Sequence, residues 1–325
     1  KMAKVKTFKT IFPAVSVPLN DDYSINEPEF RAYLRWIKTF YGKGMDGLVC
    51  NGHTGEITGL TRAERKRVVE ICAEECGDVM TIISGVNCEN TAESIEMAKE
   101  AKEAGADGIL LMPPHMWLRF GMNPDAPFEY VKDVAEGADI DIIIHLYPAT
   151  SKAFYPVETL IKMCKEIDHV KCIKMGTRVT SIYEHDVRLL RQECPDISLI
   201  TCHDETLCVS WFPGMDGALI GFAGCVPEII CPAREVFANP DKHTLKEAQD
   251  WSNRIYHISQ AIYGGGQPSG EAHARLKEAL KQRGIFKSAL MRKPVLPLND
   301  EEKAWVALGL ERSQLPEVDM TQFED

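Results

Sequence analysis

A four-residue pattern, Gly-x-Asp-Gly, occurs three times in this chain and constrains its fold more than any other feature. The copies lie at residues 44–47, 105–108 and 214–217, and each follows a helical pattern and precedes a short apolar run. A glycine that ends a helix, followed by a tight turn into a buried strand, is the helix-to-strand junction of a parallel-sheet protein. Three such junctions predict a repeated strand–helix unit.

The rest of the chain, analysed in the same way, contains eight candidate strands. Between them lie amphipathic stretches typical of helices, such as residues 27–41, 62–75 and 92–103. The strands are apolar without clean alternation, as expected when both faces of a sheet are covered. The candidate strands lie near residues 10–17, 47–51, 80–85, 107–112, 141–147, 169–174, 197–202 and 216–221.

Eight strand–helix units in about 230 residues predict an α/β fold of the (β/α)8 TIM-barrel type. An open doubly wound sheet is less favoured, because no glycine-rich dinucleotide fingerprint follows the first strand. We expect the barrel to span residues 10–240, after an N-terminal extension at residues 1–9. Residues 241–312 have only helical patterns and are predicted to form helices docked on the barrel, followed by a tail at residues 313–325.

Composition and charge limit the classes of partner. The chain has 325 residues, 45% hydrophobic and 26% charged, which is the balance of a soluble globular enzyme. Its net charge of -11 argues against nucleic acid or an anionic membrane as a partner. No apolar run approaches the ~18 residues that a membrane span requires, and the first residues contain no apolar signal core. We therefore expect a cytoplasmic protein.

The eleven cysteines show no CxxC pair, and several fall inside predicted strands or helices. This pattern indicates small core residues in a reducing compartment, not a disulfide framework. The nearest candidate for a metal site is the run Cys-His-Asp-Glu at residues 202–205. Consecutive residues rarely converge on one ion, so no metal is predicted.

Lys174 lies at the end of the sixth predicted strand, within an apolar run. An ammonium group is costly to bury, and a desolvated lysine loses its proton more easily. The neutral amine can then attack a carbonyl group and form a Schiff base. The alternative is a lysine at a strand edge whose ammonium reaches water.

Other strand ends add groups at the same edge, because the active site of such a barrel lies at the carboxyl ends of its strands. The turn at residues 52–56, Gly-His-Thr-Gly-Glu, follows the second strand, and its hydroxyl and backbone N–H groups can hold a carboxylate. Tyr147 ends the fifth strand, where its phenol can shuttle protons or simply pack. The eighth strand runs into Gly221 and Phe222, and the small residues around them leave room in the barrel mouth.

These elements, in this order, resemble the dihydrodipicolinate synthase / N-acetylneuraminate lyase family of Schiff-base-forming lyases and aldolases. The resemblance spans roughly residues 10–312. It rests on the turn at 52–56, Tyr147 with the proline after it, Ile173-Lys174 followed by Thr177, the repeat at 214–217 and the segment 292–297.

The resemblance implies a role for several of these residues. Lys174 would condense with the ketone of pyruvate or another 2-keto acid, and Tyr147 would shuttle the proton. Thr54 and the backbone of the 53–54 turn would hold the carboxylate of the keto acid. The resemblance also implies that no metal or organic cofactor is needed, and that the protein is a homo-oligomer, either a dimer or a tetramer.

Several positions depart from the family's pattern, among them Met175, which stands where an acidic residue often follows the lysine. His53 stands where the family usually has serine or threonine, and its imidazole can donate to a carboxylate or titrate. His115 lies where the synthases carry a tyrosine pair, so it is a candidate replacement for their proton relay. Lys152 stands in place of an arginine, and it supplies charge without the bidentate fork.

These departures alter the part of the site that selects the second substrate or leaving group. Arg119, Lys152 and Arg178 are candidate cations for a distal carboxylate, and the alternative for each is a solvated surface residue. Trp117 and Phe222 are candidates for an apolar wall or for core packing. The possible substrate-selecting residues are His115, Trp117, Lys152, Thr177, Arg178, Gly221 and Phe222.

The predicted function is that of a Schiff-base lyase or aldolase that acts on pyruvate or another 2-keto acid. A 2-keto-3-deoxy sugar acid dehydratase is an alternative that the sequence does not separate, because both reactions begin with attack by Lys174. The further alternatives are dihydrodipicolinate synthase itself and a keto-acid sensor without turnover.

Overall fold

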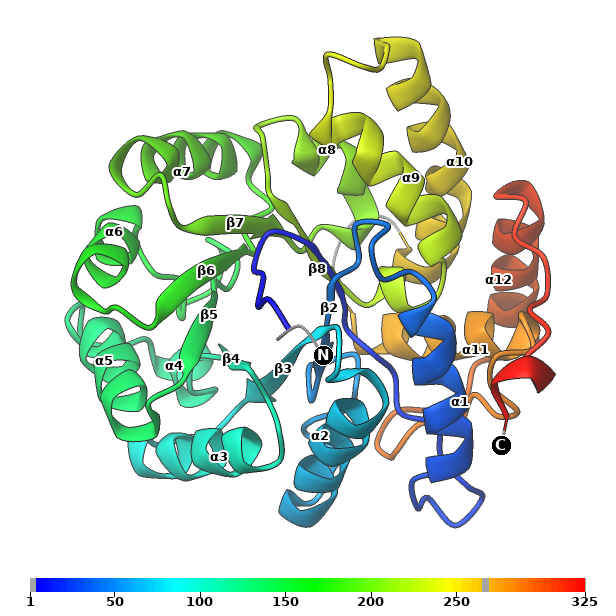
Figure 1. Ribbon diagram of the computed structural model, residues 1–325, viewed down its shortest axis with the longest axis horizontal. Helices are drawn as coiled ribbons and strands as arrows, with labels where there is room; N and C mark the ends of the chain where they lie inside the picture. The colour runs from blue at the N-terminus through cyan, green and yellow to red at the C-terminus, as the bar shows by residue number, and fades with distance from the viewer. Residues whose placement is uncertain (1–3, 265–268, 325) are drawn as a thin grey trace.

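The computed structural model describes residues 4–264 and 269–324. Eight parallel strands alternate with helices around a central axis (Figure 1). Each strand overlaps the stretch predicted for it. The strands are β1 (Ile11–Pro13), β2 (Gly47–Cys50), β3 (Thr81–Val86), β4 (Gly108–Leu111), β5 (Asp141–His145), β6 (Val170–Met175), β7 (Ser198–Thr201) and β8 (Gly217–Ile220).

The strands form one sheet that curls into a barrel. Their order is β1-β8-β7-β6-β5-β4-β3-β2, and all neighbours are parallel. The circle is closed just beyond β1, where Ala14 forms a parallel bridge to Val49 and the Val15 N–H donates to the Val49 carbonyl at 2.9 Å. The predicted (β/α)8 barrel is confirmed.

The helices of the barrel wall begin where capping residues stand in the sequence. Thr61 and Glu64 form a capping box at the start of α2, and the Asn90 side chain accepts the Glu93 N–H at the start of α3. The helices are α1 (Glu27–Lys38), α2 (Arg62–Cys76), α3 (Thr91–Glu103), α4 (Met116–Phe120), α5 (Ala126–Ala138), α6 (Val157–Glu166), α7 (Thr180–Glu193), α8 (Leu207–Trp211) and α9 (Pro227–Ala238), with 3-10 turns η1 (Asp204–Thr206) and η2 (Phe222–Gly224).

The C-terminal part of the chain adds α10 (Leu245–Tyr263), α11 (Gly270–Gln282), α12 (Asp300–Arg312) and the 3-10 turn η3 (Thr321–Phe323). These helices lie together on one side of the barrel, beside α1 and α9 (Figure 1). After α12, Leu315 and Met320 are buried, so this end of the chain packs against the rest of the protein.

Apolar side chains form two layers, because both faces of the strands are buried. One layer fills the barrel interior and the other lies between the strands and the helices. Phe12, Ile83, Leu110, Ile143 and Leu219 belong to the interior layer. Tyr147 belongs to the same interior cluster, which places the predicted proton shuttle above a packed barrel floor.

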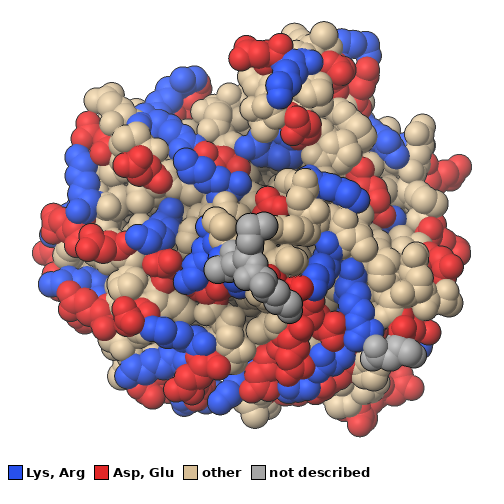
Figure 2. All heavy atoms as spheres, in the orientation of Figure 1, with Lys and Arg blue, Asp and Glu red and all other residues tan. Residues whose placement is uncertain are grey.

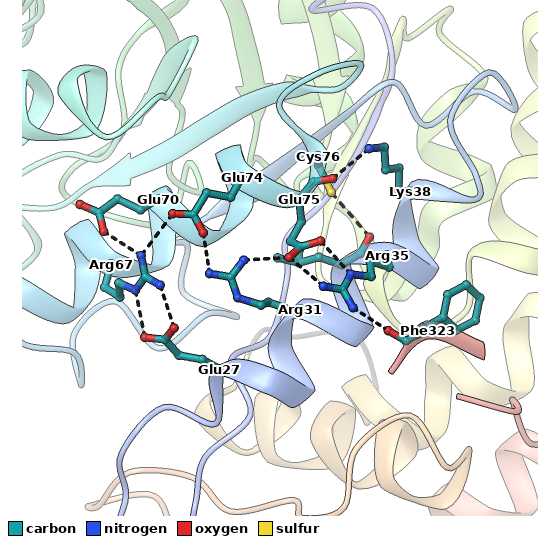
Figure 3. A network of polar contacts seen from close by, with 11 residues as sticks. Glu27, Arg31, Arg35, Lys38, Arg67, Glu70, Glu74, Glu75, Cys76 and Phe323 are labelled. Carbon is teal, nitrogen blue, oxygen red and sulfur yellow. Dashed lines mark hydrogen bonds and ion pairs between the residues drawn. The ribbon is translucent and has the colours of Figure 1, made fainter. Parts of the chain in front are cut away.

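Ion pairs join α1 to α2, and one of their arginines also forms a hydrogen bond to η3 (Figure 3). The Glu75 carboxylate accepts from Arg31 at 2.8 Å and from Arg35 at 2.9 Å. Arg35 also donates to the Phe323 carbonyl at 3.0 Å, so the network holds η3 against α1. These side chains are partly exposed, and each pair therefore stabilises the fold only slightly.

Acidic and basic side chains are interspersed over the face of the molecule that Figure 2 shows. On this face, the acidic residues that give the sequence its negative net charge lie among basic residues. Across residues 4–264 and 269–324, no helix combines the length and apolar character that crossing a membrane would require.

Asp186 on α7 is a buried carboxyl group without a hydrogen-bond partner at Oδ2, and burial raises its pKa to about 6. At pH values between the ordinary pKa of aspartate and about 6, the folded state therefore still holds this proton, whereas the unfolded state has released it. The free energy of unfolding falls as the pH rises through this window. We expect Asp186→Asn to raise the free energy of unfolding at pH 7.5 by on the order of 1–3 kcal/mol.

Urea unfolding of the wild type and Asp186→Asn at pH 4 and pH 7.5 measures this effect. The gain should be largest at pH 7.5 and nearly absent at pH 4, where the wild-type carboxyl is protonated in the folded protein. An equal gain at both values would show that desolvation of the carboxylate is not its cause.

Candidate active site

A cavity of about 360 Å³ opens at the carboxyl ends of the strands. Two parts of the chain form it, because the strand ends supply its floor and the C-terminal helices supply one side. The lining from the strand ends includes the turn at 52–54, His145, Tyr147, Lys174, Arg178, Asp204, Glu205 and Gly221. The lining from the C-terminal helices and their flanks is Tyr263, Ser269, Gly270, Ala272 and His273.

Lys174 lies on β6 directly beside His145 of β5 in the strand register. Side chains alternate along a strand, so His145 and Tyr147 point to the same face as each other, toward the cavity. Burial lowers the pKa of Lys174, although the nearby thiol of Cys202 and carboxyl of Asp204 oppose the shift. Burial thus increases the fraction of neutral amine, the form that attacks a carbonyl.

The hydroxyl of Tyr147 lies between two imidazoles. Its Oη is 3.4 Å from Nε2 of His53 and 3.4 Å from Nε2 of His115. The ring of His145 packs edge-on against the Tyr147 ring at a centroid distance of 4.9 Å. Burial, and secondarily the charge of Glu89, raise the pKa of Tyr147 well above its ordinary value, so the phenol is protonated and can donate.

The turn after β2 is held in a specific shape. Glu56 has φ +58°, and its N–H donates to the His53 carbonyl at 3.0 Å. Burial, followed by the positive charge of Lys174, lowers the pKa of His53 to about 3, so this imidazole is neutral at physiological pH. The turn therefore presents a neutral imidazole and the Thr54 hydroxyl to the cavity.

Gly221 fits closely against this turn, because a Cβ atom at this position would lie 2.6 Å from Thr54 Oγ1. We expect Gly221→Ala to push the Thr54 hydroxyl away from its position and to raise the KM for the keto acid by roughly 10- to 100-fold. Steady-state kinetics on the active substrate measures the change, with Ala272→Gly, at another lining residue, as a control for altered cavity volume. A change in kcat alone would contradict a role of this contact in binding.

Another wall of the cavity consists of paired polar groups. Arg178 donates to Glu205 at 2.8 Å, and Asp204 accepts from the Tyr263 hydroxyl at 2.8 Å and from the Phe222 N–H at 3.0 Å. Burial raises the pKa of Asp204 to about 6, against the opposing effect of these hydrogen bonds. Arg178 therefore brings no unbalanced positive charge to the cavity.

The side chains of residues 202–205 point in different directions, which is inconsistent with one shared metal ion. Asp204 and Glu205 face the cavity, and His203 packs its ring against Tyr183 at a centroid distance of 4.7 Å. Within residues 4–264 and 269–324, no group of three histidine, cysteine or acidic side chains is placed to hold a metal ion.

The structure brings most of the predicted site residues together. Lys174, Tyr147, Thr54, His53, Arg178 and Gly221 line one cavity, and His115 joins them through the Tyr147 hydroxyl. Five candidates lie elsewhere, and one of them is the exposed Arg119. Thr177 and Phe222 are buried outside the lining, Trp117 packs against Tyr130 and Tyr155, and the ammonium of Lys152 binds the Arg119 carbonyl at 3.1 Å.

Several cavity residues were not predicted from the sequence as site residues, among them His145, Asp204 and His273. His145 could have been found, because it precedes Tyr147 by two positions on the same strand. Asp204 follows a strand end, but its neighbours Tyr263 and Phe222 are far from it in the sequence. His273 comes from α11, and no local pattern marks a helix residue that reaches the mouth of a barrel.

Known proteins resemble the chain over nearly its whole length. A 4-hydroxy-tetrahydrodipicolinate synthase from Bartonella bacilliformis is 26% identical, over 94% of this chain and 98% of that protein. A synthase of the same name from Helicobacter pylori is 26% identical, over 96% and 97% of the two chains.

Solved structures share the same barrel. YagE, a prophage protein of E. coli K12 in complex with pyruvate, superposes with a TM-score of 0.84 at 21% identity, over 95% of this chain and 99% of that one. N-acetylneuraminate lyase from Fusobacterium nucleatum superposes with a TM-score of 0.78 at 21% identity, over 93% and 97%. At this level of identity, the likeness establishes the fold.

The sequence model of the Dihydrodipicolinate synthetase family matches residues 7–312. This match covers the barrel and the C-terminal helices together, and it agrees with the resemblance found in the sequence. The chain therefore belongs to the dihydrodipicolinate synthetase family.

Proposed function

We propose that the protein is a Schiff-base-forming lyase or aldolase that acts on pyruvate or another 2-keto acid. The observation that carries the proposal is the position of Lys174 at the cavity floor, where burial lowers its pKa and the Tyr147 phenol lines the same cavity. A nucleophilic amine and a proton donor are the two groups that imine formation needs. The curated relatives, which are 4-hydroxy-tetrahydrodipicolinate synthases, support the assignment.

The reaction begins at the keto carbon. The neutral amine of Lys174 adds to it, and the resulting carbinolamine loses its hydroxyl group as water when Tyr147 supplies a proton. Thr54 and the N–H groups of the 52–54 turn hold the carboxylate, so the keto carbon faces the amine. The protonated imine then accepts the electron pair of a breaking bond, and an enamine forms.

The wall of paired polar groups supports a neutral, hydroxylated group as the distal part of the substrate. The carboxyl groups of Asp204 and Glu205 can accept hydrogen bonds, and the imidazole of His273 can donate or accept one. These side chains are therefore suited to bind hydroxyl groups. Among the cavity residues in the described part of the chain, the one cation besides Lys174 is Arg178, and Glu205 already pairs with it. A distal carboxylate would meet no free positive charge there, which disfavours dihydrodipicolinate synthase proper.

Both an aldolase and a dehydratase for a 2-keto-3-deoxy sugar acid fit this wall. In the aldolase, the bond between C3 and C4 breaks, and hydrolysis of the imine releases pyruvate and an aldehyde. In the dehydratase, the enamine expels a hydroxyl group as water, and the carbon skeleton stays intact.

Incubation with pyruvate and borohydride, followed by mass measurement of the intact protein, tests the imine. We expect one covalent adduct on the wild type. A panel of hydroxylated 2-keto acids, assayed for pyruvate release, then separates cleavage from dehydration. The absence of any adduct with every keto acid would overturn the proposal, and an adduct without turnover would favour a sensor.

A further inference from the structure

Two free thiols meet between α6 and α7, which lie side by side in the ring of helices (Figure 1). Cys164 lies in the last turn of α6, and Cys194 directly follows α7. Sγ of Cys194 lies 4.0 Å from the carbonyl oxygen of Ile161, which is one turn before Cys164 on the same helix. The neighbouring residues Lys165 and Glu193 form an ion pair at 2.7 Å. Contacts on both sides therefore hold the two thiols against each other.

The Cys164 thiol forms a hydrogen bond to the Cys194 sulfur, with the S–H of Cys164 as the donor. Burial raises the pKa of both thiols. At Cys194, the positive charge of Lys165 and the S–H of Cys164 oppose this effect, and the carboxylate of Glu193 reinforces it only weakly. Cys194 therefore loses its proton more readily than Cys164, and the thiolate is the form of cysteine that reacts with oxidants.

A small oxidant can reach this pair of thiols. Cys164 is half-buried, and Cys194 is 8% exposed. Cys50 and Cys72 also interact through their thiols, but both are 0% exposed and lie in the core between strands and helices. The pair between α6 and α7 can therefore react without unfolding of the core, whereas the pair in the core cannot.

We propose that Cys164 and Cys194 form an oxidative modification site, at which hydrogen peroxide converts the two thiols into a disulfide. The side chains already meet, so the bond needs little movement of α6 or α7. The bond would close a loop that contains β6 with Lys174, and it would join two helices of the barrel wall. A cross-link of this kind lowers the entropy of the unfolded chain and so stabilises the folded one. Its formation does not depend on the reaction proposed for Lys174.

The oxidation takes two steps. The Cys194 thiolate attacks one oxygen of the peroxide, the O–O bond breaks, and the sulfur becomes a sulfenic acid while hydroxide leaves and is protonated to water. The Cys164 sulfur then attacks the sulfenic sulfur, and the S–S bond forms as the hydroxyl group takes the thiol proton and leaves as a second water. Two thiols are thus oxidised to one disulfide, and one peroxide is reduced to two water molecules.

Peptide mapping by mass spectrometry, after treatment of the full chain with hydrogen peroxide, tests the site. We expect a linked pair of peptides that contain Cys164 and Cys194 and have lost two hydrogen atoms, and we expect dithiothreitol to reverse the link. The oxidised protein should unfold at a temperature roughly 3–8 °C higher than the reduced protein. Cys88→Ser removes a half-buried thiol that contacts Met97 instead, and this control variant should form the same link.

Variants of the pair separate the two steps. Cys164→Ser should stop at a sulfenic acid on Cys194, which dimedone labels, and its unfolding temperature should not rise. Cys194→Ser should give neither the link nor a label on Cys164. Three results would overturn the site, namely a fully reduced pair after peroxide treatment, a link that involves Cys50 or Cys72, or a sulfinic acid on Cys194 beside a free Cys164.

Discussion

Lys174→Met is expected to abolish the borohydride-stable adduct with pyruvate and to lower turnover of any active keto acid by at least about 10⁴-fold. Methionine has similar length and an apolar side chain, but it has no amine that can form an imine. Because it also removes an ammonium from a desolvated position, we expect the variant to be as stable as the wild type or more stable. Intact mass after reduction and a thermal unfolding curve measure the two effects.

Lys171→Met provides the matched control. Lys171 lies on the same strand three residues earlier, is exposed, and donates to the Asp168 carbonyl. This variant should form the adduct at the wild-type level. If Lys174→Met also formed it, another lysine would be the nucleophile and the assignment of the site would be wrong.

Lys277→Met is expected to lower the free energy of unfolding by about 3–5 kcal/mol. Lys277 on α11 is almost fully buried, forms an ion pair with Glu56, and donates to the Leu290 carbonyl at 2.8 Å. The second oxygen of Glu56 accepts the Arg292 N–H at 2.8 Å. Removal of the ammonium leaves the Glu56 carboxylate buried without its counter-charge, which costs much more than the loss of a surface pair.

The same variant should weaken keto-acid binding, because Glu56 ends the turn that carries His53 and Thr54. Urea unfolding and the KM for the keto acid measure the two consequences. The double variant Glu56→Gln/Lys277→Met removes both charges and should recover part of the lost stability. Lys281→Met, an exposed lysine one turn farther along α11, should change neither quantity. A stable Lys277→Met variant with an unchanged KM would show that the pair does not hold the turn.

The pair also explains why the C-terminal helices belong to the site. The sequence predicts helices docked on the barrel in this part of the chain, where the structure has α10, α11 and α12. Their part in the cavity was not predicted. His273 lies one turn before Lys277 on α11, so the ion pair that fastens the helix to the turn also sets the position of this histidine over the cavity.

The charged candidates show most clearly where prediction from sequence stops. Lys152 and Arg178 were equivalent as candidate cations, since each follows a strand end by a few residues. The structure separates them, because Arg178 lines the cavity but is neutralised by Glu205, whereas Lys152 binds the Arg119 carbonyl outside the lining. A charge in a sequence has no fixed partner, and its effect on a ligand depends on that partner.

What the sequence determined by itself is the barrel and the rim on which Lys174 and Tyr147 lie. Strand and helix periodicity and glycine junctions are local, and the carboxyl ends of parallel strands must share one edge. Only the tertiary structure decided that His53 and His115 meet at the Tyr147 hydroxyl, that Glu205 neutralises Arg178, and that Lys277 fastens the turn at residues 52–56. These contacts join residues from 27 to 221 positions apart, and local pattern carries no information about them.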